Sequence, residues 1–184
     1  MTLQRCLWVL LAAVSVACSS EKSGNTRFSQ LDASYTGVTF HNEINETDSL
    51  NLLNYEYIYN GGGVAIIDIN NDGLKDLFFT GNQVSNALYL NIGNLQFQDI
   101  TKSALLFDNN IWSTGVAIVD INLDGFDDIY VSVGGPGDQS IYPNKLYINQ
   151  QDNTFKEQAE EYGLADSGES IQAAFFDFDL DGDL

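Results

Sequence analysis

Short apolar stretches alternate with turn-forming residues along most of the chain. In one section they fall at residues 64–68, 76–81, 87–91 and 96–101, and Gly, Asn and Asp are frequent between them. Each stretch has the length of a strand and is rich in the β-branched and aromatic residues that favour strands. Four such stretches joined by short turns predict one four-stranded antiparallel sheet.

This pattern is repeated along the chain. Residues 63–76 return with the same order of polar and apolar positions at residues 115–128, and a third copy begins at Ala173. Counted between the first aspartates of the copies, the period is 52 and then 57 residues. A regular period of this size indicates an array of similar structural units.

The array is expected to form a β-propeller. A single sheet cannot bury both of its faces, so successive units should pack face to face. Four-stranded units that pack radially are the blades of a propeller, whereas the alternative, a linear β-solenoid, uses shorter repeats. We therefore expect an all-β chain of four-stranded antiparallel blades, with about two and a half to three blades in residues 27–184.

A loop rich in oxygen ligands follows the first strand of each repeat. Its order is Asp, Asn or Asp, and Asp at alternate positions, then Gly, and in the first two copies a further Asp three residues later. Calcium takes oxygen ligands at about 2.3–2.6 Å, and a curling loop can direct alternate side chains at one ion. The predicted calcium ligands, which at Leu74, Phe126 and Asp183 are backbone carbonyls, are Asp68, Asn70, Asp72, Leu74, Asp76, Asp120, Asn122, Asp124, Phe126, Asp128, Asp177, Asp179, Asp181 and Asp183.

Two other interpretations of the loops were considered. An EF-hand needs Glu at loop position 12, but that position is Phe79 in the first copy and Val131 in the second, and the flanking residues suit strands. The EF-hand is therefore excluded. The remaining alternative is a set of Asp-Gly hairpin turns that bind no metal.

The charge of the chain limits its partners. With 26 acidic and 7 basic residues, the formal net charge is -19. Nucleic acids and anionic membrane surfaces are bound mainly through Lys and Arg, so neither is an expected partner. Both cysteines lie within the first 18 residues. The rest of the chain has no disulfide to stabilise it, and calcium could serve that purpose.

The N-terminus has the features of an export signal. Arg5 precedes an apolar stretch at residues 7–17, which is too short to span a membrane. We interpret residues 1–17 as a signal peptide, Cys18 as a lipidated first residue, and residues 18–26 as a polar tether. Ordinary cleavage before an unmodified Cys18 is the alternative. A lipid anchor would be the only membrane attachment.

A few residues outside the loops were considered as binding or catalytic groups. The single histidine, His41, has no recognisable catalytic partner and is interpreted as a surface residue. Trp112 is interpreted as a core residue. A group of tyrosines could either stack on sugars or pack in the core. These tyrosines are Tyr57, Tyr59, Tyr130 and Tyr142.

The loop, together with Asn-x-Leu-Tyr-x-Asn at residues 86–91 and 144–149, resembles the FG-GAP/VCBS repeats that are also found in integrin α-chain heads. Residues 59–65 and 112–116 are similar to bacterial surface lipoproteins related to cartilage acidic protein and to ASPIC/UnbV-type proteins. This resemblance implies a seven-bladed propeller, exported and carried at the cell surface or on the bacterial outer membrane.

The resemblance also suggests that the sequence is an N-terminal fragment. Residues 28–40 follow the template of the end of a blade, so they are expected either to supply the outer strand of a blade completed elsewhere or to cap the first blade.

We expect a non-enzymatic, calcium-binding module at the cell surface that binds a protein or a glycan, with loops such as residues 134–143 giving specificity. One alternative is a scaffold or appendage of a secreted carbohydrate-active enzyme whose catalytic residues lie beyond residue 184. Another is a purely structural spacer.

Overall fold

The computed structural model describes residues 27–107, 111–137, 142–182 and 184. Contacts divide the chain into two compact units, Met1–Leu31 and Asp32–Leu184. Within the first unit, the described residues 27–31 contain no helix or strand. The predicted signal peptide and tether, Cys18 and Asp183 lie outside the described residues.

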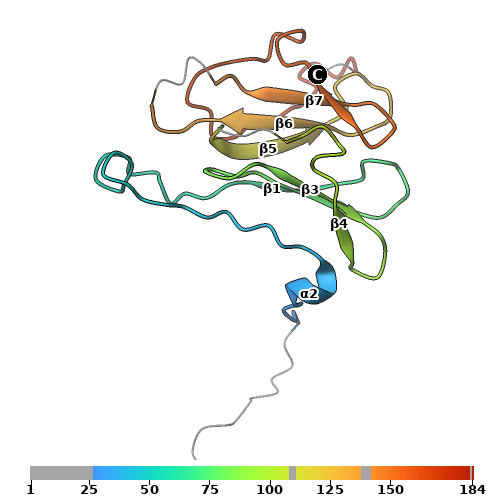
Figure 1. The fold of residues 1–184 in the computed structure, drawn as a ribbon. Coiled ribbons are helices and arrows are strands. Elements are labelled where there is room, and N and C mark those ends of the chain that lie inside the picture. Colours follow the sequence, from blue (N-terminus) through green and yellow to red (C-terminus); the bar gives the residue numbers. More distant parts are fainter. Residues whose placement is uncertain (1–26, 108–110, 138–141, 183) are drawn as a thin grey trace, which may run out of the picture. The chain divides into compact units, whose positions relative to one another are not determined.

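The second unit is built from two four-stranded antiparallel sheets (Figure 1). The first sheet has the order β1-β2-β3-β4 and the second β5-β6-β7-β8, so each sheet is a simple meander. The strands are β1 (Val64–Ile67), β2 (Asp76–Phe79), β3 (Ala87–Asn91), β4 (Phe97–Asp99), β5 (Ser113–Val119), β6 (Asp128–Val133), β7 (Lys145–Asn149) and β8 (Phe155–Glu157). The four apolar stretches of the first repeat are thus confirmed as strands, with ends that differ by up to two residues.

The described residues contain little helix. The short helix α2 (Ala33–Thr36) begins after Asp32, whose side chain accepts a hydrogen bond from Ser34 N, and ends at Gly37. Within the described part of the chain, no helix has the length and apolar character needed to cross a membrane.

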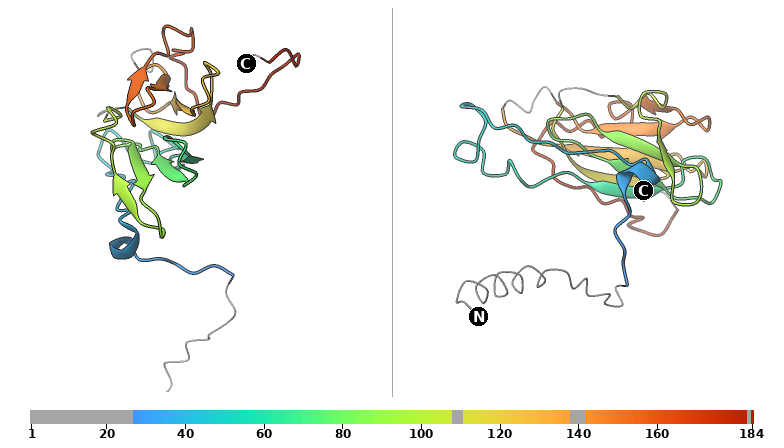
Figure 2. Two further views of the ribbon diagram at one scale, coloured as in Figure 1. Left: turned by 90° about the vertical axis from the view of Figure 1, so that its right-hand side faces the viewer. Right: turned by 60° about the horizontal axis from the view of Figure 1, so that its bottom comes forward.

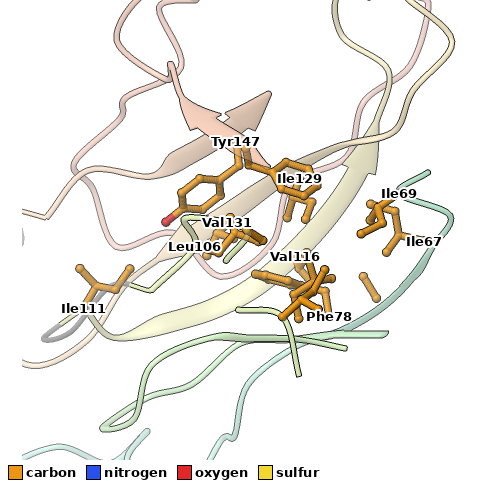
Figure 3. Packing of buried hydrophobic residues seen from close by; sticks show 14 of the residues in the cluster. Ile67, Ile69, Phe78, Leu106, Ile111, Val116, Ile129, Val131 and Tyr147 are labelled. Atoms are coloured by element: carbon orange, nitrogen blue, oxygen red, sulfur yellow. The ribbon is translucent and has the colours of Figure 1, made fainter. Parts of the chain in front are cut away.

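The two sheets pack against each other through one apolar core (Figure 3). Alternate residues of β1, Ala65 and Ile67, are buried against the second sheet, to which Val116 and Val131 contribute. Burying an aliphatic side chain of this size stabilises the fold by about 1.5–3 kcal/mol. The face-to-face packing of successive repeats, expected from the sequence, is therefore present.

The two sheets do not meet through faces that correspond in the repeat. In the first sheet the core is formed by the face that carries Ala65 and Ile67, while in the second it is formed by the face that carries Val116 and Ile118. By the repeat, Val116 and Ile118 correspond to Val64 and Ile66. These two residues are 60% and 64% exposed, while Val116 is 8% exposed.

The opposite face of the second sheet has a smaller core of its own. Tyr130, Leu146 and Ile148 are buried there with Ala159, and Phe175 from the third repeat packs on this cluster. The rings of Tyr130 and Phe175 meet edge to face, with centroids 5.4 Å apart. The start of the third repeat thus covers part of the second sheet.

The third repeat forms no strand within its described residues. The structure therefore contains two four-stranded sheets, and the expected additional half to full blade is not formed. Figure 2 shows this C-terminal segment, in red, running away from the sheets. Phe176 and Phe178, which would be strand and loop residues by the repeat, are largely exposed.

Residues 28–40 also contain no strand, so the outer strand expected there is absent. Instead, Phe40 stacks on Phe79 of β2, with ring centroids 5.0 Å apart, and Thr39 N donates to the hydroxyl of Tyr89. This arrangement agrees with the alternative, a cap on the first sheet.

Candidate metal centre

The first loop is wound around the side chain of Asp68. Its two carboxylate oxygens accept hydrogen bonds from Asp72 N (3.2 Å) and Gly73 N (3.0 Å). Asn70 Nδ2 donates to Asp72 Oδ2 at 3.1 Å. The backbone makes this turn with Asn71 and Gly73 at positive φ, where Gly meets no steric penalty. The structure therefore brings the first three predicted ligands together.

The second loop repeats these contacts. Asp120 accepts from Asp124 N (3.0 Å) and Gly125 N (2.8 Å), and Asn122 Nδ2 donates to Asp124 Oδ2 at 3.1 Å. Asp124 also accepts from Phe126 N at 2.9 Å, as Asp72 does from Leu74 N at 2.8 Å in the first loop. Two segments 52 residues apart thus form the same local structure.

The last predicted ligand of each of the first two loops is buried and connects the loop to the sheet. Asp76 is 1% exposed; its oxygens accept from Ile69 N (3.0 Å) and from Asn91 N in β3 (2.7 Å). Asp128 is fully buried and accepts from Ile121 N (3.2 Å) and Asn149 N (2.8 Å).

Burial raises the pKa of both buried carboxyl groups. For Asp128 the pKa rises to about 6, mainly because of desolvation, and repulsion from Asp124 and Asp120 adds to the effect. Desolvation, together with repulsion from the other aspartates of its own loop, likewise raises the pKa of Asp76. A cation bound nearby would favour the ionised form of each group.

The third loop gathers carboxylates most closely. Asp177 accepts from Leu180 N (2.6 Å) and Gly182 N (2.9 Å). Each of Asp177, Asp179 and Asp181 has a carboxylate oxygen within 4.8 Å of the others. Among the described residues, no other three His, Cys, Asp or Glu side chains converge in this way.

The first two loops lie side by side. Asn71 Nδ2 donates to Gly125 O at 2.9 Å, and Asn149 Nδ2 donates to Ile69 O at 2.8 Å. In these two loops the described residues show a single ion pair, from Lys75 Nζ to Asp68 Oδ2 at 3.9 Å. The negative charge of several neighbouring carboxylates is therefore balanced by only one ion pair in the described residues of these loops.

The asparagines of the Asn-x-Leu-Tyr-x-Asn motif were not predicted to have a role in the sites, although their repetition was visible. The second of them, Asn91 or Asn149, donates its backbone N–H to the buried closing aspartate and its side-chain amide to the carbonyl just before that aspartate, of Lys75 or Asp127.

The first asparagine of the motif accepts from the backbone at or just after the end of the second strand of its own repeat, Asn86 Oδ1 from Gly81 N at 2.9 Å and Asn144 Oδ1 from Val133 N at 2.7 Å. Asn144 also joins neighbouring repeats, because its Nδ2 donates to Ser170 Oγ at 2.8 Å.

The tyrosines considered for sugar binding do not form one surface. Tyr130 is buried in the core of the second sheet, and Tyr142 packs against the first core. Tyr57 and Tyr59 are exposed but line different cavities. Trp112 is only half-buried and lies outside both cores, so its interpretation as a core residue is wrong. His41 is exposed, as expected.

Comparison with known protein families finds an FG-GAP-like repeat at residues 68–131. The matched segment begins at the first aspartate of one loop, includes all of the second loop, and ends in β6. The repeat and the two four-stranded sheets agree with the blade fold of a propeller, and the repeat suggests an adhesion-type module. A search of curated proteins finds no match.

Proposed function

We propose that this chain is a non-enzymatic, calcium-stabilised propeller module at the cell surface that binds a protein or a glycan. The observation that carries the calcium part is the near-identical winding of two loops around Asp68 and Asp120, with the same side-chain and backbone contacts in each. A third copy, at Asp177, supplies the closest group of carboxylates.

The residues present fit a hard divalent cation. Each loop offers only carboxylate, amide and carbonyl oxygens, the ligands that calcium prefers. Asp68, Asn70 and Asp72 would hold the ion in the first loop, and Asp120, Asn122 and Asp124 in the second. The ion would supply positive charge between carboxylates that otherwise repel each other.

The binding part of the proposal is supported by the FG-GAP-like repeat and by the loops at the ends of the sheets. Loops carried on a rigid scaffold are common sites of recognition. We also propose that residues 1–17 direct export, that Cys18 is lipidated, and that the complete propeller has seven blades at the outer membrane or cell surface.

A calorimetric calcium titration of the full chain, with circular dichroism in calcium and in EDTA, tests the metal sites. We expect two or more ions to bind, with affinity of order 10⁻⁴–10⁻³ M, as in extracellular modules. A folded chain that binds no calcium would leave the loops as Asp-Gly turns.

Two substitutions with the same charge change separate a ligand from a nearby charge. Asp124→Asn keeps an oxygen that can accept from Phe126 N but removes a predicted anionic ligand, so calcium affinity should fall by about 10-fold at one site. Asp127→Asn alters a carboxylate that is not a predicted ligand, and affinity should change by less than about 2-fold. Equal losses of calcium affinity in the two variants would mean that binding depends on the total negative charge and not on Asp124 as a ligand.

A further inference from the structure

A small cavity lies at the end of the sheets opposite to the metal loops. The loops follow the last residues of β1 and β5, whereas the cavity is lined by residues before or at the start of these strands, by residues just after β6, and by residues 169–171. Its volume is about 270 Å³. Its lining includes Tyr55, Tyr57, Asn60, Trp112, Gly135 and Glu169.

The lining comes from three successive repeats. Asn60, Trp112 and Glu169 each stand eight residues before the first aspartate of their loops and therefore occupy corresponding positions. The first and fifth loop positions are Asp and the sixth is Gly in each repeat, while these three side chains differ in chemistry. The repeated fold does not require the differences, which make a site with one amide, one indole and one carboxylate.

Three aromatic rings form the walls of the cavity at nearly right angles. The ring of Tyr55 meets that of Tyr57 at 79° with centroids 6.0 Å apart, and that of Trp112 at 86° with centroids 5.6 Å apart. A Cβ at Gly135 would overlap the side chain of Trp112, so glycine is needed there for the indole to lie across the backbone. Rings in this arrangement form a corner rather than a flat platform.

The only charged side chain that lines the cavity, among the described residues, is that of Glu169. Burial raises the pKa of the Tyr55 phenol, and the negative charge of Glu169 adds to this rise, as expected if the carboxylate lies close to the ring. Aromatic faces and a carboxylate both attract cations. The net charge of the chain, -19, acts in the same direction over a longer range.

We propose that this cavity binds an alkylammonium group, the side chain of a lysine on a basic partner protein. The rings of Tyr57 and Trp112 would surround the ammonium group and the methylene groups next to it, and Glu169 would accept its hydrogen bonds. This inference names the partner chemistry of the binding role proposed above and rests on that role, but it does not depend on the metal loops.

Two other ligand classes fit less well. A sugar ring stacks on one flat, open aromatic face, whereas these rings meet edge to face. An anionic ligand would have to approach Glu169 without a lining Lys or Arg to compensate for it. Lysine on a protein is favoured over a free quaternary amine because the acidic chain attracts a basic surface as a whole.

Tryptophan fluorescence can test the proposal in the full chain with calcium present. Trp8 and Trp112 are the two tryptophans, so in a Trp8→Phe background the emission reports on the cavity. Tetramethylammonium chloride and a Gly-Lys-Gly peptide should each change the emission saturably, whereas sodium chloride at equal ionic strength should not. No saturable change with either probe would overturn the proposal.

Substitutions identify the groups that bind. Glu169→Gln and Tyr57→Ala should each weaken binding of both probes by at least about 5-fold. Tyr59→Ala is the matched control, because Tyr59 is similarly exposed but lies outside this cavity, and it should have no effect. Equal effects of Tyr57→Ala and Tyr59→Ala, or no effect of Glu169→Gln, would contradict the assignment.

Further comparisons separate the alternatives. Binding of tetramethylammonium without binding of the peptide would identify a small free cation and overturn the lysine partner. Saturable binding of methyl glucoside in place of both cations would make the cavity a sugar site. Calcium titration of Glu169→Gln should match that of the unsubstituted chain. If the unsubstituted chain binds calcium but neither ammonium probe, this inference alone is overturned. If the unsubstituted chain does not bind calcium, the proposed function is contradicted.

Discussion

At the scale of single residues, corresponding positions in the repeats do not always carry the residue that the backbone prefers. After β4, Leu105 has φ of 62°, and after β8 the corresponding residue is Gly163, with φ of 71°. A left-handed conformation costs a non-glycine residue about 1–2 kcal/mol. The residue that follows, Leu106 or Leu164, turns into the space beside the sheet and is packed there.

Leu105→Gly should therefore stabilise the chain. Leu105 is 68% exposed, so little apolar contact is lost, and relief of the left-handed conformation should exceed the added flexibility of glycine by about 0.5–1 kcal/mol. Urea unfolding measures the change. Leu106→Gly is the control: this leucine is 1% exposed, and its loss should cost at least about 2 kcal/mol. If Leu105→Gly lowers the stability, the Leu105 side chain makes a stabilising contact with another group.

At the scale of elements, the strands of the first sheet were predictable, but the absence of a strand in the third repeat was not. Apolar stretches of strand length, rich in β-branched and aromatic residues and separated by turns, located β1 to β4. The third copy of the repeat, which begins at Ala173, corresponds to a further first strand that is absent from the described residues. No described strand pairs with that segment, and a strand without a neighbour leaves its backbone groups unpaired.

The loops were also predictable only in part. The first three predicted ligands of each loop come together because hydrogen bonds between residues two to five apart determine the winding. The roles of Asn91 and Asn149 could not be derived from spacing alone, because these residues reach the loop from another strand, 15 and 21 residues from the aspartate that they position. In addition, Asn149 contacts Ile69, which is 80 residues away.

Asn149→Ala should destabilise the chain more than Asn91→Ala. Asn149 is 2% exposed, and its loss leaves the carbonyl of Ile69, in the loop that follows β1 of the other sheet, without its side-chain donor. Asn91 donates to Lys75 O within its own sheet and is half-buried. The expected costs are about 2–3 kcal/mol and about 1 kcal/mol, measured by urea unfolding. Equal costs would show that the contact between sheets contributes nothing.

At the scale of the whole molecule, the described sheets leave part of one apolar face uncovered. Val64 and Ile66 are exposed, although the corresponding Val116 and Ile118 are packed in the core between the sheets. The repeat predicted that sheets stack, but periodicity alone does not show which sheet lacks a neighbour. That information comes only from the packing.

Substitution of the two corresponding isoleucines tests this difference. Ile66→Asn should change stability by less than about 0.5 kcal/mol, because Ile66 is already 64% exposed. Ile118→Asn places an amide against the core and should cost at least about 2 kcal/mol. Thermal unfolding by circular dichroism compares them. If Ile66→Asn is as destabilising as Ile118→Asn, another surface covers this face in the folded protein.

The pairing of two unlike faces has an evolutionary consequence. The first sheet offers the face of Ala65 and Ile67 to the sheet after it, and the second offers the opposite kind of face, that of Val116, to the sheet before it. A duplication of one whole repeat within a gene would create a sheet whose faces already match those of its neighbours. Such chains can therefore change length in steps of one repeat without a new interface having to arise by mutation.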